Sequence, residues 1–201
     1  MTWPSVRMER WLGPPFYRAH WRARRPNGTI ETWAANLPMI NPVNFTAEGR
    51  LFTGQIGKPD TLIEIDLTGK KPPRTIASNI GCINAFDDDG QRGDQAGLYV
   101  PLADKGAVGR VDLATGTVCV IADGLGQPVS VVANERSDIF VADYGSGEIL
   151  KLKPGATPDR HIVVSGLQRP VGLALDKSGH LVVSEAISGT LSRINLSNRV
   201  K

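Results

Sequence analysis

The stretch PVSVVANERSDIFVADYGSGEIL, residues 128–150, decides the fold of this chain. It contains an apolar run, a polar turn, a second apolar run that ends at Asp143, a Gly-containing turn and the start of a third run. Short runs of Val, Ile, Phe and Leu between polar or Gly turns are typical of consecutive β-strands. The stretch therefore predicts an antiparallel meander.

The same pattern recurs along the chain in two registers that stay in phase. The first register aligns AANLPMIN (34–41), ASNIGCIN (77–84), ADGLGQPV (122–129) and VSGLQRPV (164–171). The second aligns LIEIDLTG (62–69), VGRVDLATG (108–116), EILKLKPG (148–155) and LSRINLS (191–197). In the first register, the spacings between Leu37, Ile80, Leu125 and Leu167 are 43, 45 and 42 residues. The chain is therefore built of repeats.

Each repeat predicts about four strands, and such a small sheet must pack against its neighbours to bury both faces. Units of about 40 to 50 residues with four strands are typical of propeller blades. We therefore predict an all-β fold, a β-propeller of four-stranded meander blades. About four blades occupy residues 27–201, with starts near residues 40, 83, 128 and 170.

Residues 1–26 have a different composition, which predicts a basic irregular leader. Residues 1–25 contain six Arg against the single acid Glu9, within a chain of net charge +3. Clustered Arg with Trp can contact nucleic acid, but arginines in an irregular leader are more often solvated. We expect no nucleic-acid partner.

Two interpretations of the chain's ends stay open. Residues 27–37 match the outer strand and exit at 115–125, and the last blade, from Pro170, stops before its own outer strand. Either the strand near residues 28–35 completes the last blade and closes a ring, or the chain is an arc of a larger propeller. We favour a partial chain, an arc of a six-bladed ring, whose exposed blade faces would promote self-association.

The sequence shows no signal-peptide pattern and no apolar run of about 18 residues. We therefore expect no membrane association, and a cytoplasmic location by default. Cys82 and Cys119 have no CxxC spacing, so neither a disulfide framework nor a thiolate metal site is indicated.

The segments PVGLALDKSGHLVVSE and PVSVVANERSDIFVADYGSGEIL resemble the gluconolactonase and senescence-marker-protein family (SMP-type, LRE-like) of six-bladed propellers, and the related NHL repeats. In that pattern, Pro, a variable residue and Gly lead through an apolar strand to Asp-x-x-Gly and a second strand. The resemblance covers residues 27–197.

This resemblance implies one divalent cation on the propeller axis, most often Ca²⁺, bound by Asn or Asp after the repeated Pro position. Here the aligned residues are Asn41, Asn84, Val129 and Val171. Asn41 and Asn84 are thus the candidate metal ligands, while the two valines cannot coordinate a cation.

Meander geometry returns the end of each second strand to the face where the first strand starts. Gln55, Asp104, Asp143 and Glu185 are therefore expected on the rim above the axis. Asp143 and Glu185 are the candidate catalytic acids. In the alternative interpretation, each carboxylate only accepts backbone N–H bonds in the turn that follows it.

Two functions follow. In the first, the protein is a metal-dependent hydrolase of small-molecule lactones or sugar lactones, in which the cation polarises the lactone carbonyl and activates water. In the second, it is a non-catalytic NHL-type scaffold that binds a ligand or protein partner, because Val129 and Val171 make half of the axis apolar.

The run DDDG, residues 87–90, resembles a calcium loop but lacks the alternating spacing of an EF-hand. It aligns with TAEG and DKSG of other repeats. We therefore expect Asp87, Asp88 and Asp89 to form a solvated turn.

Overall fold

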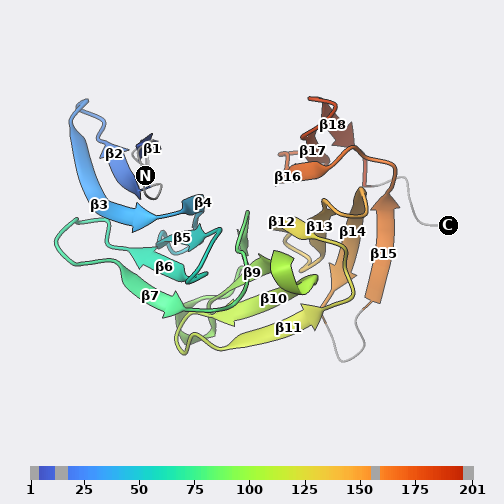
Figure 1. The fold of residues 1–201 in the computed structure, drawn as a ribbon, viewed down its shortest axis with the longest axis horizontal. Coiled ribbons are helices and arrows are strands. Elements are labelled where there is room, and N and C mark those ends of the chain that lie inside the picture. Colours follow the sequence, from blue (N-terminus) through green and yellow to red (C-terminus); the bar gives the residue numbers. More distant parts are fainter. Residues whose placement is uncertain (1–4, 12–17, 155–158, 197–201) are drawn as a thin grey trace.

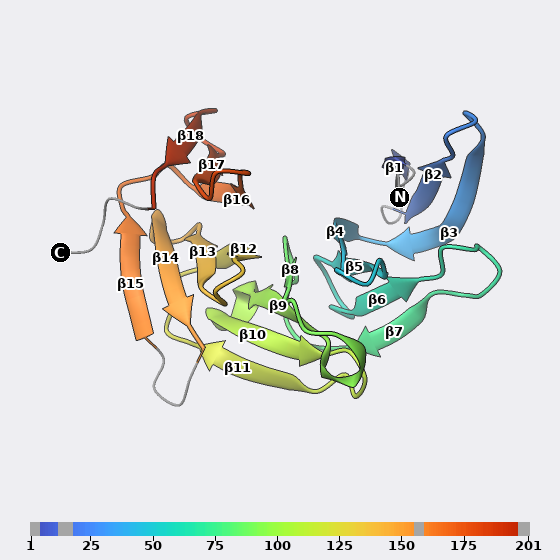
Figure 2. The same cartoon turned by 180° about the vertical axis from the view of Figure 1, so that it is seen from behind.

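The structure is a computed structural model that describes residues 5–11, 18–154 and 159–196. The chain folds as a β-propeller, and the described residues form five antiparallel sheets. Figures 1 and 2 show these sheets following one another along an arc, with the first and last sheets at its two ends.

The first three sheets account for residues 5–122. The first contains β1 (Ser5–Trp11), β2 (Arg18–Arg24) and β3 (Ile30–Pro38). The second contains β4 (Ile40–Phe45), β5 (Leu51–Gln55), β6 (Leu62–Ile65) and β7 (Arg74–Ala77). The third contains β8 (Asp87–Asp88), β9 (Gly97–Leu102), β10 (Ala107–Asp112) and β11 (Val118–Ala122), with 3₁₀ turns η1 (Gly93–Gln95) and η2 (Ala103–Lys105).

The last two sheets account for residues 128–194. The fourth contains β12 (Pro128–Ala133), β13 (Ile139–Asp143), β14 (Glu148–Lys153) and β15 (Asp159–Val164). The fifth contains β16 (Pro170–Leu175), β17 (Leu181–Glu185) and β18 (Leu191–Ile194). The second to fifth sheets coincide with the four repeats of the sequence, so the predicted propeller of meander blades is confirmed.

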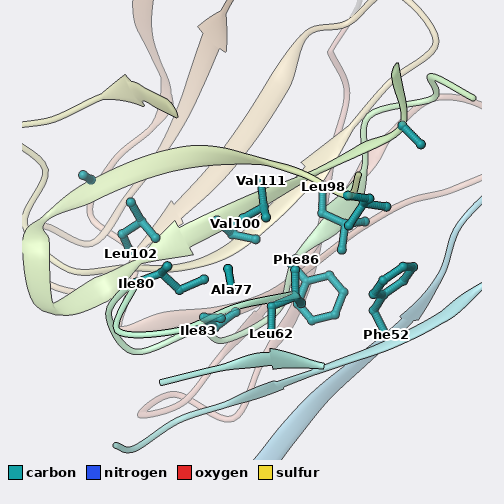
Figure 3. Close-up of a cluster of buried hydrophobic side chains, with 13 residues drawn as sticks. Phe52, Leu62, Ala77, Ile80, Ile83, Phe86, Leu98, Val100, Leu102 and Val111 are labelled. Carbon is teal, nitrogen blue, oxygen red and sulfur yellow. The ribbon is translucent and has the colours of Figure 1, made fainter. Parts of the chain in front are cut away.

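The core consists of apolar layers between consecutive sheets. Figure 3 shows the layer between the second and third sheets, where Phe52 and Leu62 face Phe86 and Leu98. Another layer joins the first and second sheets and includes Trp21. Fully burying one Leu or Phe side chain contributes about 1.5–3 kcal/mol, so each sheet is stabilised mainly by its neighbours.

For the described part of residues 1–26, the structure corrects the expectation of an irregular leader. β1 and β2 pair with each other, and β2 also pairs with β3. Trp21 and Ala23 are buried, whereas Arg24 is exposed, because alternate residues of a strand point to opposite faces. Arg24 therefore lies on the opposite face of the sheet from the core residues Trp21 and Ala23.

The pairing of β3 bears on one of the two interpretations of the chain's ends. β3 is hydrogen-bonded to β2 within the first sheet, and the described strands of the last sheet are β16, β17 and β18. Residues 30–38 therefore do not complete the last blade. A six-bladed ring stays a prediction.

Candidate functional site

The first strands of successive blades lie side by side and run in the same direction. Ala85 and Ser130 form a parallel bridge, and Val131 N–H donates to the Ala85 carbonyl at 2.9 Å. Leu173 N–H donates to Ser130 Oγ at 3.2 Å. All these strands therefore begin at one end of the molecule, which we call the mouth, and Asn41, Asn84, Val129 and Val171 lie there.

The structure brings Asn41 and Asn84 together at the mouth. Asn41 Nδ2 donates to Asn84 Oδ1 at 3.0 Å, and Ala85 N–H donates to the same oxygen at 3.0 Å. Both residues are partly buried. Two blades thus place their amide groups at one point, which is the position that the repeat alignment predicts.

The two valines make the other side of the mouth apolar. Val129 is buried and packs in the layer between the fourth and fifth sheets, and Val171 is half-buried. Neither side chain offers a ligand atom to a cation.

Asp143 lies at the end of β13 and has a structural role in its own blade. Its carboxylate accepts backbone N–H bonds from Gly126 and Gln127 at 2.7 Å, Gly145 at 3.0 Å and Ser146 at 3.2 Å. Burial raises the pKa of this carboxyl, but the four N–H groups outweigh burial and hold the pKa below its ordinary value. Asp143 is therefore an anion that fixes the loop leading into β12.

Glu185 has the equivalent role at the end of β17. Its carboxylate accepts the N–H of Gln168, in the loop leading into β16, and the hydroxyl of Thr190 at 2.7 Å. The N–H of Gln168 is the main cause of a lowered Glu185 pKa. The contacts of both candidate catalytic acids thus match the alternative interpretation, a carboxylate that anchors backbone.

The backbone pairing identifies which residues are equivalent in the four blades. Ile56, Ala103, Tyr144 and Ala186 each donate an N–H to the segment before the first strand of the same blade. The residues before them are Gln55, Leu102, Asp143 and Glu185. The equivalent residue in the third sheet is therefore Leu102, because Asp104 lies two positions later, in η2.

Gln55 has the same anchoring role in the second sheet as Asp143 and Glu185 have in theirs, since its Nε2 donates to the Pro38 carbonyl at 2.8 Å.

The structure also corrects the interpretation of DDDG as a solvated turn. Asp87 and Asp88 form β8. Asp87 accepts hydrogen bonds from Asn44 Nδ2 and Ala133 N–H, both at 2.9 Å, so it joins three blades. Burial raises the pKa of the Asp87 carboxyl. Asp89 is buried and paired with Arg110. The run aligned with turns of other repeats, but inter-blade hydrogen bonds place it inside the molecule.

Sequence reasoning missed two residues of the mouth, Arg169 and Tyr144. The Arg169 guanidinium carbon lies 4.5 Å from the centroid of the Tyr144 ring. The residues equivalent to Arg169 in the other blades are Met39, Cys82 and Gln127, from the same backbone pairing. Arg169 is thus the one charged residue of the four, and the repeat alignment contained this signal.

The donor set at the mouth does not fit a tightly bound divalent cation. Asn41 and Asn84 supply neutral amide oxygens, whereas Ca²⁺ affinity rises with the number of carboxylate ligands. Across the described ranges, no group of three or more His, Cys, Asp or Glu side chains is arranged to bind a metal ion. Asp143, the nearest buried acid of the fourth blade, is occupied by backbone N–H groups.

Another groove lies between the fourth and fifth sheets and has a volume of about 1470 Å³. The turns 134–138 and 176–179, at the far end from the mouth, contribute to its lining. Its charged groups pair with one another, such as Lys151 with Asp138 at 2.9 Å and His161 with Asp159 at 2.8 Å. We therefore place the candidate site at the mouth.

In the described part of the chain, no helix is long and apolar enough to cross a membrane.

No family model matches the chain, and no curated protein matches it either. Several solved structures share its fold. A streptogramin B lyase has a TM-score of 0.70 and 11% sequence identity, over 98% of this chain and 72% of the lyase. The virginiamycin B lyase of Staphylococcus aureus has a TM-score of 0.66 and 10% identity, over 91% of this chain and 67% of the lyase.

A third structure is described as a candidate gluconolactonase. It has a TM-score of 0.69 and 13% identity, over 96% of this chain and 79% of that chain. At such identities the likeness concerns the fold alone. The chain is similar in its β-propeller architecture to two lyases and to a candidate gluconolactonase.

Proposed function

We propose that the mouth binds a small polar ligand, a lactone or a sugar, through Asn41 and Asn84. The observation that carries the proposal is the 3.0 Å hydrogen bond between their side chains, which come from two different blades. A carboxamide both donates and accepts hydrogen bonds, so this pair suits the hydroxyl, ring and carbonyl oxygens of such ligands. The half-buried Val171 supplies an apolar contact for the ligand's carbon skeleton.

Cation-dependent lactone hydrolysis is the second candidate function. It is favoured by one observation, the meeting of Asn41 and Asn84 where the gluconolactonase resemblance puts metal ligands. We rank binding above hydrolysis because the carboxylates of Asp143 and Glu185 are engaged elsewhere. Backbone N–H groups donate hydrogen bonds to both carboxylates and stabilise their negative charge.

Calorimetry with D-glucose tests the binding proposal. We expect the double variant Asn41→Ala/Asn84→Ala to weaken binding at least about tenfold, the effect of losing about 1.4 kcal/mol of hydrogen bonding. Asn27→Ala is the matched control, because Asn27 is exposed and bonds to Thr29 in the turn between β2 and β3. Unchanged glucose binding in the double variant would contradict the proposal.

Hydrolysis is tested separately with D-glucono-1,5-lactone in the presence of CaCl₂ or a chelator. If the protein only binds its ligand, the rate stays at the spontaneous rate under both conditions. A chelator-sensitive rate that disappears in Asn41→Ala/Asn84→Ala would instead favour the second candidate.

A further inference from the structure

Arg169 lies at the mouth in an unusual backbone conformation. Its φ angle is +61°, in the left-handed region that residues other than Gly, Asn and Asp rarely adopt. Arg169 is exposed, and its guanidinium stacks on the ring of Tyr144 from the preceding blade. Both the backbone and the far end of this side chain therefore have defined positions.

Hydrogen bonds on both sides fix the loop that carries Arg169. Leu167 N–H donates to the Gly147 carbonyl at 2.9 Å, and Gln168 N–H donates to Glu185. The Arg169 carbonyl accepts the N–H of Ala186 at 2.9 Å. An Arg positioned in this way loses little conformational freedom when it binds a ligand.

The stacking leaves the hydrogen-bonding edge of the guanidinium available. A ring contact uses the flat face of the group, whereas its N–H groups lie in the plane and match the two oxygens of a carboxylate. Among the described side chains, no carboxylate forms an ion pair with Arg169. Asp143, next to Tyr144 in the chain, is directed to four backbone N–H groups instead.

The position of Arg169 connects it to the asparagine pair. It lies two residues before Val171, and the parallel inner strands place Val171 beside Val129, which is equivalent to Asn84. Arg169 and the amide pair thus lie at the mouth on different blades, and the half-buried Val171 follows Arg169 in the chain. A ligand that spans the mouth meets amides at one end and a guanidinium at the other.

We propose that Arg169 selects ligands that carry a carboxylate, so that the mouth takes a sugar acid in preference to a neutral sugar. This inference rests on the proposed binding role of Asn41 and Asn84. Tyr144 is the positioning residue, because its ring holds the guanidinium in place.

The test compares D-glucuronate with D-glucose by calorimetry on the full chain at low salt. We expect at least about tenfold tighter binding of glucuronate, the usual effect of a charge-assisted hydrogen-bond pair. Arg169→Gln is expected to abolish this preference, because it weakens the binding of glucuronate more than that of glucose. Tyr144→Leu is expected to reduce the preference and Tyr144→Phe to keep it, because only the ring is needed. Arg136→Gln, an exposed arginine at the far end from the mouth, is the control.

The outcomes separate this inference from the function on which it rests. Equal binding of both sugars by the wild-type chain, or a preference that survives Arg169→Gln, overturns the role of Arg169. If binding of both sugars still depends on Asn41 and Asn84, the proposed function stands without the inference. If neither sugar binds, both proposals are wrong for this ligand class.

Discussion

At the scale of single residues, one carboxylate connects three blades. Asp87 in β8 accepts hydrogen bonds from Asn44 in β4 and from the backbone of Ala133 in β12. Its neighbour Asp88 accepts the N–H of Ala47 at 2.6 Å, which adds a second bond to the blade of β4. An acceptor of two bonds cannot be replaced by a donor without leaving a partner unsatisfied.

We predict that Asp87→Ala lowers the free energy of unfolding by about 1–3 kcal/mol. It leaves the partly buried Ala133 N–H without this acceptor and removes one of the two acceptors of Asn44 Nδ2. A double-mutant cycle with Asn44→Ala should give a coupling energy above about 0.5 kcal/mol. Urea unfolding measures both. Asp94→Ala, at an exposed acid in η1, should change stability by less than about 0.5 kcal/mol. Additive effects of the two substitutions would contradict the contact.

The residue scale is also where sequence reasoning is weakest. The repeat alignment located Asn41 and Asn84 correctly at one end of the inner strands. It could not decide the roles of Asp143 and Glu185, because their partners are backbone N–H groups, which no sequence pattern displays. It also identified Asp104 instead of Leu102, because η2 shifts the alignment by two residues.

At the scale of elements, a glycine precedes the third strand of two blades where another backbone approaches. Gly147 has a φ angle of +73°, and a Cβ atom on it would lie 2.5 Å from the Leu167 carbonyl oxygen. Gly106 meets the Leu125 carbonyl in the same way. Leu125 and Leu167 are the residues that define the first repeat register, so the repeat reflects this close approach of backbones.

We predict that Gly147→Ala destabilises the protein by more than the strain of its φ angle alone. Gly179→Ala is the matched control, because Gly179 has a φ angle of +75° and a Cβ atom on it would meet no other atom within 4 Å. The control should cost about 1–2 kcal/mol, the penalty of a left-handed residue. Thermal unfolding of both variants gives the comparison, and equal losses would show that the close approach is unimportant.

The elements of residues 1–26 were predictable in part. In RAHWRAR, residues 18–24, Ala19, Trp21 and Ala23 alternate with polar residues, which is the pattern of a half-buried strand. The high arginine content favoured the prediction of a solvated leader over that of a strand. The blades from residue 40 onward were easier to predict, because four aligned copies reinforce a pattern that one copy shows weakly.

At the scale of the whole molecule, acidic groups fixed by hydrogen bonds should make stability depend on pH. The pKa values of Glu64, Asp138 and Asp143 lie below their ordinary values, and those of Asp66 and Asp176 lie at about 2. Carboxyls with lowered pKa values stabilise the fold above their ordinary pKa and lose this contribution as the pH falls. Asp87 acts in the opposite direction, because its pKa is raised.

We therefore predict that the urea midpoint falls as the pH is lowered from 4.5, the ordinary pKa of a Glu carboxyl, to about 2. Asp143→Asn should show a shallower decline over this range, since one contributing carboxyl is gone. Urea titrations at several pH values measure the slope. A slope identical to that of the wild type would mean that Asp143 does not contribute.

Gln55, Asp143 and Glu185 each anchor the segment that leads into the first strand of their own blade. In each case the anchored backbone directly precedes that strand in the sequence. The residues that face the mouth follow directly after these segments, on backbone that is already fixed. Evolution can therefore change ligand preference one blade at a time, by single substitutions at positions such as 41 or 169, while the anchored backbone stays the same.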